Sequence, residues 1–447
     1  MIHATTAERL EMPPTANAGV SVSTLRLIDF RNYAALDLRL GREHVVLVGE
    51  NGAGKTNLLE AVSLLSPGRG LRRATIEDMG RVGTAAGWTV ATTLDGPNGE
   101  TRIGIGFTGE AGEPRTRQIR IDGEPARTAE ELIEHSHILW LTPAMDGLFA
   151  GPAAERRRFL DRFVLALDPG HAARVASFER TMRGRNKLLE EDRLDEGWLD
   201  AIEAQMAEIG VAIASARVEA VACLAGLIAA TRDDRSPFPH ADLALEGEIE
   251  ALAAAGGPAG AIEDRYIAML RDNRRRDKAA GRTLDGPHRA DLIVGHGPKA
   301  MPAALSSTGE QKALLLGLVL AHAHLVAETH GRAPILLLDE VAAHLDQRRR
   351  AALFDRLHAL GGLMPCVTSV IRHNVPEAIV GRILGYATSS QYVGQVAGPL
   401  LGGFIGGVIG MRAVFLGTAV TMALGAAFAW ISRPAASPSK VATVMPD

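Results

Sequence analysis

A phosphate-binding loop is the feature of the sequence that points most directly to chemistry. A Gly-x4-Gly-Lys-Thr pattern runs through Gly49, Glu50, Asn51, Gly52, Ala53, Gly54, Lys55 and Thr56. Its glycines let successive backbone N–H groups turn toward a phosphate at the start of a helix. Its lysine places a positive charge beside the β- and γ-phosphates, and its threonine hydroxyl is a ligand for Mg²⁺. A chance glycine-rich turn is the alternative. However, the apolar run Val45–Val48 before the loop and the helical stretch Asn57–Leu65 after it supply the strand and the helix that the motif requires.

Two adjacent carboxylates follow a second apolar run. Ile335-Leu-Leu-Leu338 predicts a central strand, and Asp339 and Glu340 stand at its C-terminal end. We expect Asp339 to hold Mg²⁺ through a water, and Glu340 to orient and deprotonate the attacking water. Apolar runs that end in Asp-Glu are common by themselves. Together with the phosphate loop, this run predicts ATP hydrolysis with ATP and Mg²⁺ as cofactors.

A third motif opens the helix upstream of these carboxylates. It consists of Ser306, Ser307, Thr308, Gly309, Glu310 and Gln311. Small residues and free backbone N–H groups at a helix N-terminus form a second anion site, although an ordinary helix cap has the same composition. Because only one of the two phosphate sites is a P-loop, we expect two chains to sandwich two nucleotides, as a homodimer that forms with ATP. Val341–Asp346 then resembles the loop that crosses such an interface, with Asp346 as its acid (a D-loop).

The elements that must position these residues follow from the hydrophobic pattern. Alternating apolar residues predict paired strands between 20 and 40 and an antiparallel sheet between 80 and 125, whereas 150 to 280 reads as helical. The simplest interpretation is an α/β ATPase lobe that is interrupted by a helical lobe. The predicted segments are a disordered leader 1–20, a first ATPase part 21–149, a helical lobe 150–285, a second ATPase part 286–362, and a hydrophobic tail 363–447.

Overall charge does not indicate a nucleic-acid partner. The chain of 447 residues has a formal net charge of −4, and the first 362 residues have −7 because the tail carries +3. Binding to DNA must therefore come from local basic patches. The two cysteines form no disulfide framework, and a reducing cytosol is the natural setting.

Clusters of arginines on predicted helices are the candidates for contacts with DNA phosphates. The candidates are Arg156, Arg157, Arg158, Arg185, Arg274, Arg275 and Arg276. A solvated helix face, or ion pairs with nearby acids, is the alternative for each cluster.

Several of these motifs together resemble a known family. The P-loop, the Ser-Thr-Gly-Glu-Gln motif and the Asp-Glu strand are similar to the ABC-type ATPase heads of SMC-like repair proteins. In addition, 27–33, Arg156–Asp161, Arg185-Asn186, Gly286–Arg289 and Ser307–Lys312 resemble the RecF family over about residues 21–362. The resemblance implies a cytoplasmic, weakly DNA-stimulated ATPase of recombinational repair. Such a protein binds single-stranded and gapped duplex DNA, works with RecO and RecR, and takes part in SOS induction. It also implies that Arg31 and Asn32 lie near the nucleotide.

The tail departs from that family. Leu363–Ile371 contains Pro365 where the family has a strand, so we expect an unpaired sheet edge. Gln391–Gly410 and Ala413–Ile431 contain 20 and 19 residues without a charge, which is enough to span a bilayer. This apolar helical hairpin resembles the last two helices of a major facilitator transporter, and it is the only predicted route to a membrane. A buried apolar hairpin of a soluble domain is the alternative.

Two other function classes remain for comparison. An ABC-type ATPase associated with a membrane transporter would explain the P-loop and the tail together, although about 280 residues separate Thr56 from Asp339. A membrane carrier is excluded, because carriers need many more spans than one pair of helices.

Overall fold

The described residues all lie in the first of two compact units, Met1–Ile371. In the computed structural model the described ranges are 3–6, 19–42, 44–50, 52–83, 87–107, 116–191, 195–341, 345–360 and 366–368. The predicted membrane-like hairpin and Asn51 of the P-loop lie outside these ranges.

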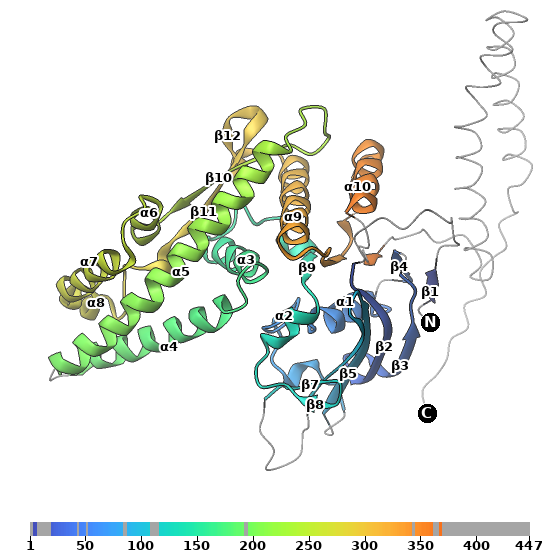
Figure 1. The fold of residues 1–447 in the computed structure, drawn as a ribbon, viewed down its shortest axis with the longest axis horizontal. Helices are drawn as coiled ribbons and strands as arrows, with labels where there is room; N and C mark the ends of the chain where they lie inside the picture. Colours follow the sequence, from blue (N-terminus) through green and yellow to red (C-terminus); the bar gives the residue numbers. More distant parts are fainter. Residues whose placement is uncertain are drawn as a thin grey trace, which may run out of the picture. The chain divides into compact units, whose positions relative to one another are not determined.

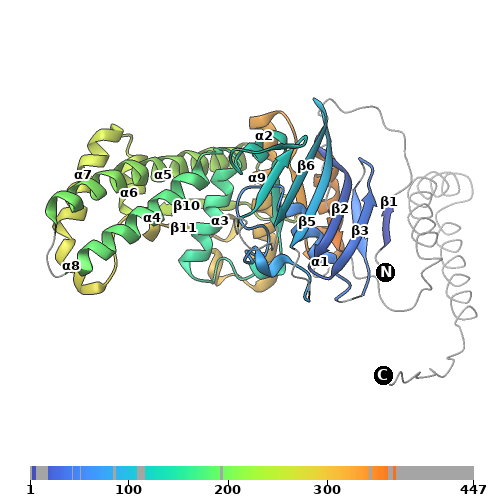
Figure 2. The same cartoon turned by 90° about the horizontal axis from the view of Figure 1, so that it is seen from below.

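A six-stranded antiparallel sheet forms the outer layer of the ATPase lobe, in the order β3-β2-β5-β6-β7-β8. Figure 2 shows its long strands side by side. The strands are β2 Ser21–Phe30, β3 Tyr33–Arg39, β5 Trp88–Gly96, β6 Gly99–Phe107, β7 Gln118–Ile121 and β8 Glu124–Pro125. Alternate residues such as Leu25, Val90 and Ile103 face inward and pack with helix α1, Lys55–Ser63. Burying each such aliphatic side chain, rather than leaving it exposed, stabilises the folded state by about 1.5–3 kcal/mol.

A second sheet carries the predicted chemistry at its strand ends, and its order is β1-β4-β14-β13-β9. The strands are β1 His3–Thr6, β4 Val45–Val48, β9 Ile138–Leu141, β13 Ile335–Leu338 and β14 Cys366–Thr368. The central strands β4, β14, β13 and β9 run parallel, so β4 and β13 end at the same edge.

Two expectations about this sheet are wrong. The predicted disordered leader contributes strand β1, which pairs antiparallel with β4. The segment after Gly362 does not leave an unpaired edge, because β14 lies between β13 and β4 and pairs with both. Strand β14 has only three residues, and Val367 in its centre pairs with Leu338 of β13 and with Val46 of β4.

The helical lobe is built on one long helix (Figure 1). Its helices are α3 Ala153–Leu165, α4 His171–Glu190, α5 Glu196–Ala230, α6 Glu248–Ala254, α7 Ala259–Asp272 and α8 Arg274–Ala280. Phe178, Met206 and Tyr266 belong to a core shared by α4, α5 and α7. The region is not wholly helical, because β10 Ala241–Glu246 pairs with β11 Asp291–His296, and β12 Met301–Pro302 completes a small sheet.

Three further helices complete the unit. Helix α2, Glu131–His135, precedes β9, and helix α10, Gln347–Ala359, follows the Asp-Glu strand. Helix α9, Thr308–His330, is long and apolar, and most of its side chains are buried in the core that it shares with α3 and β9. The fold-class prediction of a mixed α/β ATPase head with a helical lobe is confirmed.

Candidate functional site

The P-loop connects strand β4 to helix α1 with two glycines in the left-handed region. Gly52 has φ 85° and Gly54 has φ 100°. A Cβ at position 54 would lie 2.6 Å from Nδ2 of Asn32 and 2.7 Å from the hydroxyl of Tyr33. Both the backbone conformation and the close approach therefore require glycine at this position.

Lys55 is buried and is anchored against its own loop. Its Nζ donates hydrogen bonds to the carbonyl oxygens of Gly49 at 2.7 Å and Glu50 at 2.8 Å. Only 7% of the residue is exposed. Its two hydrogen-bond partners are neutral carbonyl groups, so its positive charge is available to a phosphate bound in the loop.

Thr56 and Asp339 meet although 283 residues separate them. The Thr56 hydroxyl donates a hydrogen bond of 3.1 Å to Oδ2 of Asp339. Asp339 is held at the end of β13 because its backbone N–H donates to the Leu141 carbonyl of β9. A hydroxyl and a carboxylate are hard oxygen ligands of the kind that Mg²⁺ takes, so the pair fits this ion.

Glu340, the predicted base, follows Asp339 with φ 52°. A left-handed conformation is uncommon for a residue other than glycine. It costs about 1–3 kcal/mol and persists where the surroundings enforce it, as in active sites. This conformation turns the chain sharply directly after the strand that carries Asp339.

Arg31 and Asn32 occupy different positions relative to the loop. Nδ2 of Asn32 lies 3.4 Å from the Ala53 carbonyl, which places this side chain at the P-loop. The Arg31 guanidinium instead binds both carboxylate oxygens of Glu60, at 2.6 and 2.8 Å. Arg31 is therefore fixed to helix α1 through Glu60, which lies one turn after Thr56.

Glu60 is a residue that the sequence interpretation missed. It is fully buried and forms ion pairs with Arg31 and Arg72. Arg72 also donates to Asn57, which in turn donates to Asn32. The signal was an acid that stands between the apolar pairs Leu58-Leu59 and Ala61-Val62 of the helix, because a buried carboxylate needs charged partners.

The third motif lies at the exposed start of α9. Ser307, Thr308 and Gly309 are exposed, and a Cβ at Gly309 would meet nothing within 4 Å. Glu310 and Gln311 hold the turn: Gln311 donates to the carbonyls of Ala304 and Ser306. Both the backbone N–H and the hydroxyl of Ser307 donate to Glu310.

The charge state of Glu310 follows from these contacts. The Lys299 ammonium at 2.6 Å and the hydrogen bonds from Ser307 lower the pKa of Glu310 to about 2. Its carboxylate is therefore ionised at neutral pH and supports the turn. Asp346 has a similar local role, because its Oδ1 accepts from the backbone N–H of Arg349 at the start of α10. The residues between Val341 and Leu345 lie outside the described ranges.

The first arginine cluster is mostly used inside the protein. Arg156 forms a two-point ion pair with Asp291 at 2.6 and 2.8 Å, and 15% of its side chain is exposed. Arg157 donates to the Ala290 carbonyl, and burial lowers its pKa. Arg158 is exposed and pairs with Glu155. Arg156 is therefore wrong as a DNA contact, because Asp291 already binds its guanidinium.

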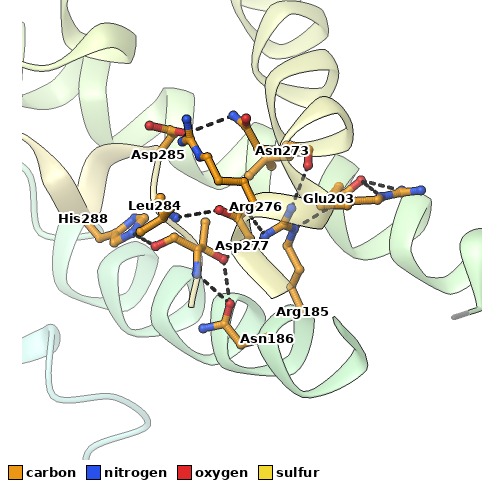
Figure 3. A network of polar contacts seen from close by, with 12 residues as sticks. Arg185, Asn186, Glu203, Asn273, Arg276, Asp277, Leu284, Asp285 and His288 are labelled. Atoms are coloured by element: carbon orange, nitrogen blue, oxygen red, sulfur yellow. Dashed lines mark hydrogen bonds and ion pairs between the residues drawn. The ribbon is translucent and has the colours of Figure 1, made fainter. Parts of the chain in front are cut away.

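Arg185 is also wrong as a DNA contact, because it is completely buried. Its guanidinium donates to Glu203, Asp277, Thr283 and the Leu270 carbonyl at 2.7–2.9 Å. Figure 3 shows this side chain enclosed by the polar residues of α5 and α8. The group has no surface to offer to a ligand.

The third cluster divides in the same way. Arg274 binds Glu203 and Asp200, and 13% of its side chain is exposed, so it too belongs to the network and is wrong as a contact. Arg276 is half exposed and pairs with Asp285, while Arg275 is exposed. The helical run therefore leaves two of three candidates at the surface.

Comparisons with known proteins agree with this geometry. The family model described as "RecF/RecN/SMC N terminal domain" matches residues 21–385, and that described as "Major Facilitator Superfamily" matches 358–445. The chain is 60% identical over 344 residues to the DNA replication and repair protein RecF of Rhizobium etli, covering 77% of this chain and 91% of that protein. It is 58% identical to RecF of Agrobacterium fabrum, covering 77% and 90%.

A solved structure shares the fold. The structure described as "recombination mediator protein RecF-ATP in RecFOR pathway" superposes with a TM-score of 0.69 at 22% identity, covering 81% of this chain and 95% of that one. The relatives are repair proteins, so the comparisons give no support to the transporter-associated alternative. The chain belongs to the RecF family of DNA replication and repair proteins, within the RecF/RecN/SMC group of ABC-type ATPases.

Proposed function

We propose that this chain is an ATP-driven switch that binds DNA in recombinational repair, with slow ATP hydrolysis that DNA stimulates. The observation that carries the proposal is the contact between the Thr56 hydroxyl and the Asp339 carboxylate beside the buried Lys55. A cation, a hydroxyl and a carboxylate at one end of a parallel sheet are the groups that bind a nucleoside triphosphate with Mg²⁺.

Each residue has a role in this proposal. The N–H groups of Gly49–Gly54 cradle the phosphates, and Lys55 binds the β- and γ-phosphates. Thr56 and Asp339 hold Mg²⁺, which neutralises charge on the phosphates when it is bound. Glu340 positions the attacking water and accepts its proton. Asn32 supports the nucleotide from the side of the P-loop.

The exposed start of α9 completes the site of a second copy. Ser307, Thr308 and Gly309 present hydroxyl and backbone N–H groups to solvent, and a helix N-terminus favours an anion. In a symmetric dimer this surface binds the γ-phosphate held by the partner's P-loop, and the D-loop around Asp346 lies at the same interface.

Membership of the family supports the proposed DNA partner and pathway. Relatives that are 60% identical bear the name of a DNA replication and repair protein, and the similar solved structure is described as part of the RecFOR pathway. We infer that this chain binds single-stranded and gapped duplex DNA, acts with RecO and RecR in SOS induction, and works in the cytoplasm.

The test is ATP turnover with and without gapped DNA in the full chain and in Glu340→Gln. We expect DNA to raise the wild-type rate. The variant should bind ATP normally but hydrolyse it at least about 100-fold more slowly, because it lacks the general base. Glu328→Gln, a change at an exposed acid on α9, is the matched control. Normal turnover by Glu340→Gln would refute the role of this residue.

A further inference from the structure

The outer face of the antiparallel sheet carries an ordered arrangement of arginines that the ATP site does not use. Successive side chains along each strand point to opposite faces of the sheet. The side chains on the outer face include Arg26 on β2, Arg102 on β6 and Arg120 on β7. All three are exposed. In Figure 2 the strands β3, β2, β5 and β6 of this sheet lie side by side.

The strand register places arginines at both ends of one row. Arg39 on β3 pairs with Thr24 on β2, and Thr24 pairs with Thr93 on β5. Thr93 then pairs with Arg102 on β6. Two small residues therefore separate the two arginines of this row.

A neighbouring row repeats the pattern two residues along the strands. Arg26 pairs with Ala91, and Ala91 pairs with Gly104. Gly104 pairs with Arg120 on β7. The row again reads arginine, small, small, arginine. At about 4.8 Å between strands, the arginines of each row are separated by about 14 Å at the backbone.

The small residues between the arginines form a low strip. Thr89 and Gly106 continue it in the next row. A Cβ at Gly104 would meet only the Cβ of Arg120, at 4.0 Å, which is an ordinary contact. Packing within the protein therefore does not demand glycine at this position, and the low surface is left for a partner that lies across the sheet.

Acids on this face reduce its positive charge but do not cancel it. Asp37 pairs with Arg26, and Asp95 pairs with Arg42. Glu100 lies opposite Asp95, and Oδ1 of Asp122, in the turn after β7, accepts a hydrogen bond from the backbone N–H of Arg102. The Arg26–Asp37 pair is largely exposed and the Arg42–Asp95 pair is partly exposed. Exposed pairs contribute only about 0–1 kcal/mol, so a phosphate can replace either carboxylate. With Arg39, Arg102 and Arg120, five arginines face these four acids, so the face carries a net charge of +1.

We propose that this face, defined by Arg26, Arg39, Arg102 and Arg120, binds the phosphate backbones of duplex DNA. Two lines of cations on either side of a low strip suit a duplex, which presents two backbones across a groove that is about 12 Å wide. Arginine contacts to phosphate position the duplex and do not read its sequence. The inference rests on the proposed function and places the DNA contact on the ATPase lobe. In the helical lobe, Arg185 and Arg274 are bound by carboxylates and are not available to phosphates.

The test measures duplex binding by fluorescence anisotropy in the full chain. Replacing all four arginines with glutamate should weaken binding about 100-fold and reduce the slope of log affinity against log salt by about 3–4, because each lost phosphate contact releases one ion fewer. ATP binding should not change, since none of the four lies in the P-loop. The quadruple arginine-to-lysine variant should stay within about threefold of wild type, because it keeps the charges.

A matched control separates a site from bulk charge. Arg232, Arg235, Arg265 and Arg282 are four exposed arginines of the helical lobe that are not among the predicted DNA contacts. Their replacement by glutamate changes the net charge equally and should weaken binding by no more than about threefold. Gly104→Trp, which fills the strip without changing charge, should weaken binding about tenfold by blocking close approach.

Two results would overturn the inference. If the quadruple glutamate variant binds the duplex as wild type does, the face is not the DNA site, and an acidic protein partner becomes its occupant. That result would leave the proposed function intact. If wild type itself fails to bind duplex DNA, the proposed function falls, and this inference falls with it.

Discussion

The two lobes use buried cations in opposite ways. In the ATPase lobe Lys55 is buried, but its hydrogen bonds go to neutral carbonyls of its own loop. In the helical lobe Arg185 is completely buried, and two carboxylates bind it. A cation with neutral partners can accept a ligand anion, whereas one that is enclosed by carboxylates stabilises the fold.

A second network in the helical lobe follows the same rule. Arg217 binds Asp161 and Glu250 and donates to the Pro287 carbonyl, and His171 also binds Asp161. Burial raises the pKa of Glu250, although Arg217 opposes this shift. Two segments that resemble the family, Arg156–Asp161 and Gly286–Arg289, thus meet in structural contacts.

The largest expected effect is on folding stability. Arg185→Met should lower the free energy of unfolding by about 3–5 kcal/mol, because it leaves Glu203 and Asp277 buried without their partner. Arg275→Met, on the exposed side of α8, should change it by less than about 0.5 kcal/mol. Urea titration followed by circular dichroism measures both. Equal stability of the two variants would contradict the assignment of Arg185 to the fold.

The next effect is on nucleotide binding. Lys55→Met should weaken ATP binding at least about 100-fold, equivalent to about 2.7 kcal/mol, because it removes the lysine of the P-loop. Lys187→Met, at an exposed lysine of α4, is the control and should bind ATP as wild type does. Calorimetric titration with ATP measures both affinities, and an unchanged affinity in Lys55→Met would refute the assignment of the P-loop as the ATP site.

The smallest effect is on the pH dependence of stability. Burial, together with the nearby Arg162, lowers the pKa of His322 to about 3. The unfolded chain binds a proton at this residue below about pH 6.5, whereas the folded chain does not. Its contribution is therefore complete above that pH and is lost as the pH falls toward 3.

This contribution can be isolated by substitution. Between pH 6.5 and 5.5 wild type should lose about 1 kcal/mol more stability than His322→Leu. His324→Leu, an exposed neighbour on α9, should keep the wild-type dependence. Urea unfolding at the two pH values measures the difference, and parallel curves for wild type and His322→Leu would contradict the burial of a neutral imidazole.

The strands and helices around the P-loop and the Asp-Glu pair could be predicted from local motifs. The P-loop lies directly between a strand and a helix, so the sequence contains both the ligands and the elements that hold them. The strand Ile335–Leu338 has the predicted bounds, and α9 begins at Thr308, within the motif predicted to open a helix. Thr56 and Asp339 meet because β4 and β13 end at the same edge of the parallel part of the sheet.

Long-range contacts made the rest unpredictable. Strand β10 pairs with β11, which lies about 50 residues later in the chain, and the sequence around β10 does not indicate which strand it pairs with. The arginine runs also gave no indication of which side chains face solvent, because Glu203 and Asp277 reach Arg185 from two separate helices. Each arginine row of the antiparallel sheet depends on the register of four neighbouring strands, and composition does not reveal this register.

A mixing experiment tests most directly whether two chains complete each other's ATP site. Lys55→Met should lose ATP binding but keep its exposed α9 start. Ser307→Arg should bind ATP, but its bulky cation should block the partner's γ-phosphate, so each variant alone should hydrolyse almost no ATP. Mixed in equal amounts, they form heterodimers in which one of the two sites is intact, and activity should rise to about a quarter of wild type. No recovery on mixing, with both variants folded, would contradict the shared site.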